Sequence, residues 1–185
     1  MSDSDAAPGK VVVNRSMSLD GFIAGPGHEM DWAIEHFRDN PFPEIEQATG
    51  AMLVGRGTYE VAKRMRPEDT SYDGGPQFVL THRPPEEPDP GITFLTCDLA
   101  EAVATARAAA GGKDLEVLGA DLASQCLRRG LVDEVLVYVL PVLLGDGVRF
   151  STPDLGRIDL EPFATTRSGQ VTMLRFRVRK PAVQH

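Results

Sequence analysis

Three short polar loops in this sequence have residue types that suit phosphate binding, and each follows an apolar run. The first loop, Gly55–Thr58, comes directly after the apolar stretch Ala51–Val54. A strand, a glycine and then a helix start would present free backbone N–H groups and the positive end of the helix dipole to an anion. Arg56 would add a planar guanidinium whose N–H groups can donate to phosphate oxygens, and Thr58 would add a hydroxyl. The alternative is a capped helix start, with Thr58 as N-cap and Arg56 in solvent.

The second loop, Thr81-His82-Arg83, follows the apolar run that ends at Leu80. It offers a hydroxyl, a titratable ring and a guanidinium in three consecutive positions. Such a cluster would bind the 2′-phosphate of an adenosine, the group that distinguishes NADP from NAD, through charge-assisted hydrogen bonds. The alternative is a polar loop that leads into two prolines.

The third loop is the pair Gly119-Ala120, at another predicted strand–helix junction. Small residues there would let the backbone approach a pyrophosphate closely. The alternative is a tight turn in which the Asp121 carboxylate caps the next helix. Three such junctions in one small sheet favour a nucleotide site, because ligands of open α/β sheets bind outside the carboxyl ends of the strands.

Two acids are candidates for catalysis and substrate binding. Asp20 follows the first predicted strand, and Asp31 opens the first predicted helix beside Trp32. Either acid would position the substrate or assist proton delivery, and Trp32 would contact the substrate. The alternatives are a turn-forming role for Asp20, an N-cap role for Asp31, and a place in the core or pocket wall for Trp32.

The elements that must position these residues alternate between strands and helices. Strands are predicted at Lys10–Ser16, Phe22–Ala24, Ala51–Val54, Gln77–Leu80, Ile92–Leu95, Leu115–Leu118 and within Val132–Leu144, with a hairpin at Ile158–Ser168 and Val171–Arg179. Helices are predicted at Asp31–Phe37, Pro43–Thr49, Thr58–Met65, from the cap residue Asp98 to Gly111, and at Asp121–Arg129. This alternation, followed by a run of strands, predicts an α/β sheet whose C-terminal strands are antiparallel. Residues 10–180 are predicted to form one domain after a disordered lead-in, residues 1–9, and Arg66–Pro76 to form a surface loop.

Composition excludes several classes of function. The 185 residues carry a net charge of −8 without a Lys/Arg-rich run, which argues against nucleic-acid binding. No stretch has the eighteen or so apolar residues of a membrane helix, and the N-terminus lacks the pattern of a signal peptide. Cys97 and Cys126 form no CxxC motif, so reduced thiols and a cytoplasmic location are expected. The four histidines have no metal-ligand spacing, and neither a hydrolase elbow nor an ATPase phosphate loop is present, so no metal is predicted.

Several segments, taken in order, resemble the dihydrofolate reductase superfamily, in its branch similar to the reductase domain of bacterial riboflavin biosynthesis. They are Met17–Ala24, Gly55–Thr58, Val79–Arg83, Leu131–Glu134 and Pro141–Gly147. The resemblance spans about Val11 to Phe176. It implies a three-layer α/β/α fold with a single mixed sheet of mainly parallel strands and an antiparallel C-terminal hairpin, NADPH as cofactor, and a homodimer.

The same resemblance assigns residues to the cofactor. It places Gly55, Arg56 and Thr58 at the cofactor phosphates, and Thr81, His82 and Arg83 near the adenosine phosphate. Near the pyrophosphate or nicotinamide ribose it places Gly119, Ala120, Asp121 and Leu122. The backbone around Ser16–Ser18 and Ile23–Ala24 would surround the nicotinamide carboxamide, with Ser18 and Ala24 as contacts. The family commonly has two consecutive glycines where this chain has Gly119-Ala120.

These observations lead to one main hypothesis and one alternative. The main hypothesis is an NADPH-dependent reductase that transfers a hydride to a small heterocyclic, imine or carbonyl substrate, similar to the reductase of the riboflavin pathway. The alternative is a non-catalytic nucleotide-binding module on the same fold. The sequence does not identify the substrate, because a fold-level analogy does not supply one.

Overall fold

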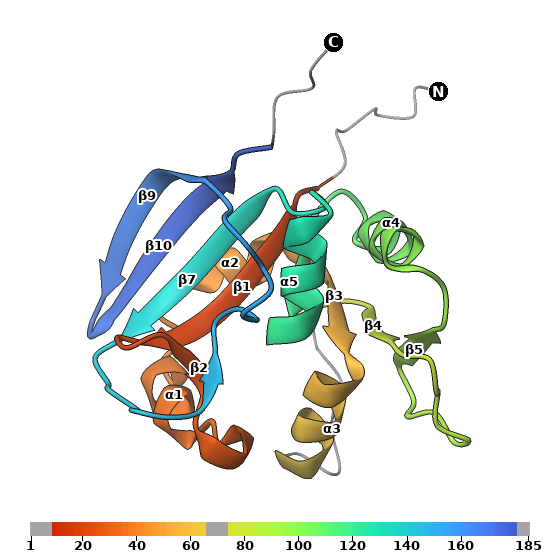
Figure 1. Ribbon diagram of the computed structural model, residues 1–185, viewed down its shortest axis with the longest axis horizontal. Helices are drawn as coiled ribbons and strands as arrows, with labels where there is room; N and C mark the ends of the chain where they lie inside the picture. The colour runs from red at the N-terminus through yellow and green to blue at the C-terminus, as the bar shows by residue number, and fades with distance from the viewer. Residues whose placement is uncertain (1–8, 66–73, 181–185) are drawn as a thin grey trace.

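An eight-stranded mixed sheet organises the chain in the computed structural model, which describes residues 9–65 and 74–180 (Figure 1). The strand order is β5-β4-β3-β6-β1-β7-β10-β9. Six of these strands are parallel: β1 Val11–Ser18, β3 Thr49–Gly55, β4 Gln77–Leu80, β5 Ile92–Leu95, β6 Asp114–Leu118 and β7 Glu134–Leu140. The antiparallel strands β9 Leu160–Ser168 and β10 Val171–Val178 complete the sheet beside β7. The predicted mixed sheet with an antiparallel C-terminal hairpin is confirmed.

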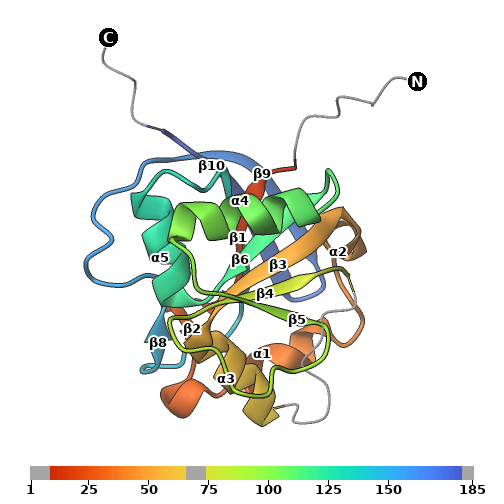
Figure 2. The same cartoon turned by 90° about the vertical axis from the view of Figure 1, so that its right-hand side faces the viewer.

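Helices cover both faces of this sheet and make the three predicted layers. On one face lie α4 Leu99–Ala109, which crosses in front of the strands in Figure 2, and α5 Ala120–Arg128, which stands in front of the sheet in Figure 1. On the other face lie α1 Asp31–Ile34, α2 Pro43–Ala48 and α3 Arg56–Met65. Two single 3-10 turns, Pro26–His28 and Glu35–Phe37, flank α1. A short second sheet pairs β2 Phe22–Ala24 with β8 Val148–Arg149, and this pairing was not predicted.

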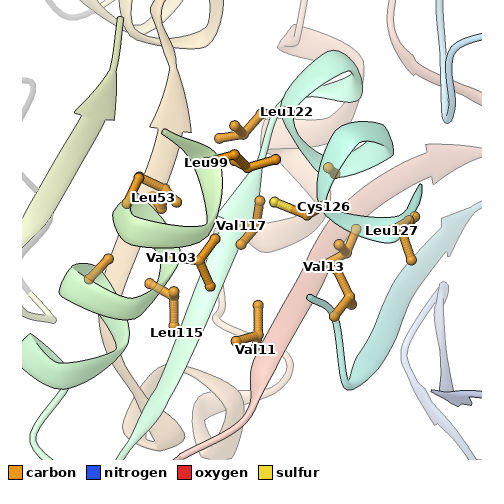
Figure 3. Packing of buried hydrophobic residues seen from close by; sticks show 14 of the residues in the cluster. Val11, Val13, Leu53, Leu99, Val103, Leu115, Val117, Leu122, Cys126 and Leu127 are labelled. Atoms are coloured by element: carbon orange, nitrogen blue, oxygen red, sulfur yellow. The ribbon is translucent and has the colours of Figure 1, made fainter. Parts of the chain in front are cut away.

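The largest core cluster joins the sheet to α4 and α5. Alternate strand residues point to this face because successive side chains of a strand alternate between faces. Figure 3 shows the strand residues Val13, Leu115 and Val117 packed against the helix residues Val103 and Cys126, all of which are buried. This packing fixes α5 with its amino end at the edge of the sheet where β6 ends.

Local capping starts α4 where the sequence predicts it. The Asp98 carboxylate accepts hydrogen bonds from the backbone N–H groups of Ala100, at 2.8 Å, and Glu101, at 3.1 Å. At the N-terminal edge, the carbonyl of Gly9 accepts a hydrogen bond from Arg107 Nε at 2.6 Å. The other residues of the predicted lead-in, 1–8, and residues 66–73 of the predicted surface loop lie outside the described residues.

Candidate functional site

The carboxyl ends of the parallel strands meet at one edge of the sheet and line a cleft of about 1210 Å³. This volume exceeds the usual range of about 300–1,000 Å³ for one small ligand, so the cleft has room for two molecules side by side. All three predicted loops line it. The predicted site residues in its lining are Ala24, Gly55, Arg56, Thr58, Thr81, His82, Arg83, Gly119, Ala120, Asp121 and Leu122.

The first loop joins β3 to α3 and links the other loops. α3 begins at Arg56, so Thr58 lies inside the first turn and is not the N-cap. Arg56 donates one hydrogen bond from Nε to the Glu60 carboxylate at 2.7 Å and another from Nη1 to the carbonyl of Arg83. Arg56 is therefore held between its own helix and the second loop, and its guanidinium faces the cleft.

The second loop forms a tight turn after β4. The Thr81 hydroxyl is buried and accepts a hydrogen bond from the backbone N–H of Arg83 at 3.1 Å. This bond fixes the turn, while the side chains of His82 and Arg83 are exposed at the mouth of the cleft. Two basic or titratable side chains thus stand where a phosphate group can reach them without desolvating a buried charge.

The third loop requires glycine at its first position. Gly119 has φ 96° and ψ 132°, a conformation in which L side chains are strained. α5 begins at Ala120 with Gly119 as the cap residue, so Asp121 lies in the first turn and does not cap the helix; its carboxylate instead accepts a hydrogen bond from Gln125 Nε2 at 2.8 Å. Because α3 and α5 both begin at this cleft, two sets of free backbone N–H groups point toward it.

A buried guanidinium adds positive charge behind the third loop. Arg15, in β1, is only 6% exposed, and burial lowers its pKa to about 10. Its Nη2 donates to the carbonyl of Gly119 at 2.6 Å, and its guanidinium lies 5.5 Å from the centroid of the Phe150 ring. Among residues 9–65 and 74–180, no carboxylate forms an ion pair with Arg15, and its buried Nε has no hydrogen-bond partner. A buried cation without a counterion favours an anionic ligand nearby.

A second polar group lies on the opposite face of the sheet. Glu116 of β6, Asn14 of β1 and Tyr138 of β7 all line the cleft, and Glu116 is 8% exposed. Oε1 of Glu116 accepts hydrogen bonds from Asn14 Nδ2 at 2.9 Å and from Thr49 Oγ1 at 2.8 Å. Burial raises the pKa of Glu116, and these two hydrogen bonds oppose that rise. The cleft thus has a basic side beside α5 and an acidic group on the face of α1 and α2.

Asp20 and Ser18 lie outside the lining of the cleft and hold a loop together. The Asp20 carboxylate accepts hydrogen bonds from Ser18 Oγ at 2.7 Å and from the N–H groups of Leu144 at 3.1 Å and Gly145 at 2.7 Å. The Ser18 hydroxyl, which is fully buried, also accepts from Phe22 N at 3.0 Å. The hydrogen bonds from Ser18 and Leu144 lower the pKa of Asp20 to about 2. The Asp20 carboxylate thus joins the end of β1 to the loop that follows β7, and its predicted catalytic role stays a prediction.

Asp31 and Trp32 also lie outside the cleft lining. Asp31 is the first residue of α1, exposed, and the cap position belongs to Met30. Trp32 is half-buried against the core on the α1 face and donates a hydrogen bond from Nε1 to the carbonyl of Glu29 at 3.1 Å. The proposed contacts of Asp31 and Trp32 with substrate therefore have no support from the geometry and stay predictions.

Sequence reasoning missed the polar residues that the strands themselves carry into the cleft. Asn14 and Arg15 interrupt a run that begins with three valines, and Glu116 interrupts the apolar strand Leu115–Leu118. A charged residue in a strand that is buried on both faces is the signal that would have identified them, because such a charge needs a partner or a ligand.

Neither a metal-binding group nor a membrane-spanning helix is found among the described residues. No group of three or more His, Cys, Asp and Glu side chains in the described ranges has the arrangement of a metal site. Within the same ranges, no helix is long and apolar enough to cross a membrane.

Comparisons with known proteins agree with this architecture. The uncharacterized protein YwjB of Bacillus subtilis (strain 168) is 27% identical over 170 residues, which cover 90% of this chain and 97% of YwjB. The crystal structure of a putative riboflavin biosynthesis protein from Shewanella sp. PV-4 superposes with a TM-score of 0.77 at 22% identity, covering 92% of this chain and 99% of that one. Dihydrofolate reductase from Enterococcus faecalis, complexed with NADP(H) and RAB-propyl, gives a TM-score of 0.63 at 13% identity, over 94% of this chain and 98% of that one.

The structural likenesses, at such low identity, show that the fold is that of dihydrofolate reductase. The family is shown by a sequence model described as the RibD C-terminal domain, which matches residues 9–174. The predicted superfamily and branch are thereby confirmed, and this chain belongs to the RibD C-terminal domain family.

Proposed function

We propose that this protein is an NADPH-dependent reductase of a small heterocyclic, imine or carbonyl substrate, similar to the reductase of the riboflavin pathway. One observation carries the proposal: the three predicted phosphate loops line a single cleft in which two helices begin. The buried guanidinium of Arg15 supports it, because an anionic cofactor would neutralise a charge that has no ion-pair partner among the described residues.

The residues in the cleft fit such a cofactor in the predicted order. Arg56 and Thr58 would hold phosphate oxygens, and His82 and Arg83 would bind the 2′-phosphate at the mouth. Gly119–Leu122 would pack against the pyrophosphate and ribose, with Ser16 and Ile23–Ala24 beside the nicotinamide. A bound reduced nicotinamide supplies a hydride, and the protein orients the acceptor and adjusts its electrostatic environment.

The family supports a reductase, and one neighbour supports the cofactor. The Enterococcus faecalis enzyme with the same fold is complexed with NADP(H). The proposal does not depend on the predicted catalytic roles of Asp20 and Asp31.

Homodimerisation is a separate part of the proposal. Two features predict it, the family resemblance and the long apolar run Val135–Leu144 in the sequence. Much of that run is β7, which pairs with β1 on one side and β10 on the other. Most apolar residues of β7 are buried in the sheet, whereas Leu143, which follows β7, is 71% exposed, so the expectation of a dimer depends mainly on the resemblance. Sedimentation of the protein at micromolar concentration tests it, because a 20.1 kDa species alone would contradict a dimer.

The first test is a titration with NADPH and with NADH, followed by nicotinamide fluorescence. The proposal expects micromolar binding of NADPH and much weaker binding of NADH. A screen of imines and carbonyl compounds for NADPH oxidation follows. Binding without oxidation of NADPH would favour the non-catalytic nucleotide-binding module, and no binding of either nucleotide would overturn the proposal.

A further inference from the structure

The buried residue Glu116 lines the cleft, and one oxygen of its carboxyl group has no hydrogen-bond partner among the described residues. The residue is 8% exposed and lines the cleft from the middle of the sheet. Every hydrogen bond that the described residues make to its carboxylate goes to Oε1, from Asn14 and Thr49. These two bonds fix the carboxyl group in place and leave Oε2 for a ligand. Oε2 is accessible to solvent, so a polar group of a substrate in the cleft can reach it and form a hydrogen bond.

The charges around Glu116 favour its protonated form. Asp114 of the same strand raises its pKa further, and no cation among the described residues forms an ion pair with it. The pKa of Tyr138, in β7, is raised by burial and then by the Glu116 charge, while a hydrogen bond with the Asn14 side chain acts in the opposite direction. The Glu44 charge, from α2, also raises the pKa of Tyr138, and the Arg175 charge, from β10, lowers it.

We propose that Glu116 is the acid of this site and donates its proton from Oε2 to the heteroatom of a C=N or C=O group. This inference rests on the proposed function. It also assigns the substrate class: a neutral imine or carbonyl compound whose heteroatom reaches the side of the cleft formed by Asn14, Glu116 and Tyr138.

Reduction adds a hydride to the carbon and a proton to the nitrogen of the C=N bond. The carbon of the C=N bond accepts a hydride from the reduced nicotinamide, and a new C–H bond forms. The π electron pair moves to nitrogen, which takes the proton from Glu116, so the imine becomes an amine and the nicotinamide is oxidised. Glu116 is left as a carboxylate and recovers a proton from water through the open cleft. A positioned acid of this kind accelerates reduction by about 10²–10⁴-fold.

The two acids predicted from sequence do not offer the same chemistry. Asp20 is saturated by three hydrogen bonds that stabilise its ionised form and lower its pKa to about 2, so it is a poor proton donor. Asp31 is exposed and lies outside the cleft lining. Glu116 combines a place in the cleft, a free oxygen and an environment that disfavours its charge.

The decisive experiment compares two probes that differ in their need for a proton. The neutral imine 3,4-dihydroisoquinoline needs both a hydride and a proton, whereas the cation N-methyl-3,4-dihydroisoquinolinium needs only a hydride. NADPH oxidation is measured with both, at a pH where the imine is neutral, for wild type and Glu116→Gln. The glutamine oxygen can still accept from Asn14 and Thr49, so the variant preserves the hydrogen bonds that hold the side chain.

We expect Glu116→Gln to slow reduction of the neutral imine about a hundredfold or more and to leave reduction of the cation and NADPH binding unchanged. Glu101→Gln, which changes an exposed carboxylate on α4, is the matched control and should alter neither rate. Equal slowing of both probes, or slowing of neither, overturns the proposal.

A second measurement does not need turnover. Infrared spectra recorded across pH identify the carboxylic acid band that Glu116→Gln removes. We expect this band to titrate above the ordinary glutamate pKa of about 4.3; titration at or below that value overturns the proposal, including where wild type reduces neither probe. Failure of wild type to bind NADPH would overturn the proposed function instead, and the infrared titration would still decide the protonation of Glu116.

Discussion

Gly119, the cap residue of α5, lies in direct contact with Thr58, in the first turn of α3, so the amino ends of the two helices meet here. A Cβ atom on Gly119 would stand 2.5 Å from Thr58 Oγ1, closer than real Cβ contacts allow. The amino ends of α3 and α5 can approach each other only because one of the two residues has no side chain. The contact that the sequence suggested between Gly119 and a cofactor is thus first a contact within the protein.

Gly119→Ala should destabilise the protein and weaken NADPH binding. The alanine would combine an unfavourable positive φ with a clash against Thr58, and such backbone strain costs about 1–3 kcal/mol. Denaturant unfolding should show a loss of this size in the free energy of unfolding. Gly57→Ala is the stability control, because its Cβ would meet nothing within 4 Å in α3. An equal loss in both variants would contradict the contact as the cause.

Arg56→Ala and Arg83→Ala should affect cofactor binding in different ways. Loss of a charge-assisted hydrogen bond of about 1.5–3 kcal/mol corresponds to tenfold or more in affinity, so Arg56→Ala should weaken NADPH and NADH alike. Arg83→Ala should weaken NADPH more than NADH, because only NADPH carries the 2′-phosphate. Fluorescence titrations check both, with the exposed Arg64→Ala at the far end of α3 as control. Unchanged binding in both variants would show that the site assignment is wrong.

Asp20→Asn should lower stability at neutral pH but not in strong acid. The pKa of Asp20 falls from 3.8 to about 2 on folding, so the ionised carboxylate stabilises the folded state above pH 3.8, and this contribution disappears as pH falls through about 2. Unfolding of wild type and variant across this range should show a difference that shrinks toward low pH. Asp39→Asn, an exposed loop substitution, is the control. A folded Asp20→Asn variant that retains NADPH oxidation would contradict the predicted catalytic role of Asp20.

The two cysteines should differ sharply toward iodoacetamide. Burial raises the pKa of the Cys126 thiol to about 12 and removes it from solvent, so it should remain unlabelled in the folded protein. Cys97 is partly exposed and lines the cleft, so it should react first, and bound NADPH should slow the reaction. Mass spectrometry of the labelled protein checks both, with Cys97→Ser expected to take up no label until it unfolds. Rapid labelling of Cys126 would contradict the packing of α5.

Local sequence patterns determined the fold and the three loops. The β-branched and apolar runs predict the parallel strands, and a glycine, Gly55 or Gly119, marks the point where β3 and β6 end. The alternation of strands and helices predicts a parallel sheet, because parallel strands need crossovers. The order of the strands, in which β6 and β1 lie between β3 and β7, was decided only by the tertiary structure. Since all parallel strands end at the same edge, the sequence alone was sufficient to predict that the loops converge.

Only the tertiary structure decided what each polar residue does. Asp20 looks like a catalytic acid in sequence, but the loop at Leu144 and Gly145 returns to take its hydrogen bonds. In sequence, Glu116 and Arg15 stand out only as charges within apolar strands, and it is the pairing of β1 with β6 that brings Glu116 beside Asn14 and Arg15 beside Gly119. The physical reason is that secondary structure follows from local propensity and hydrophobic pattern. The charge state and partners of a side chain depend instead on residues about a hundred positions away, which meet only when the sheet forms.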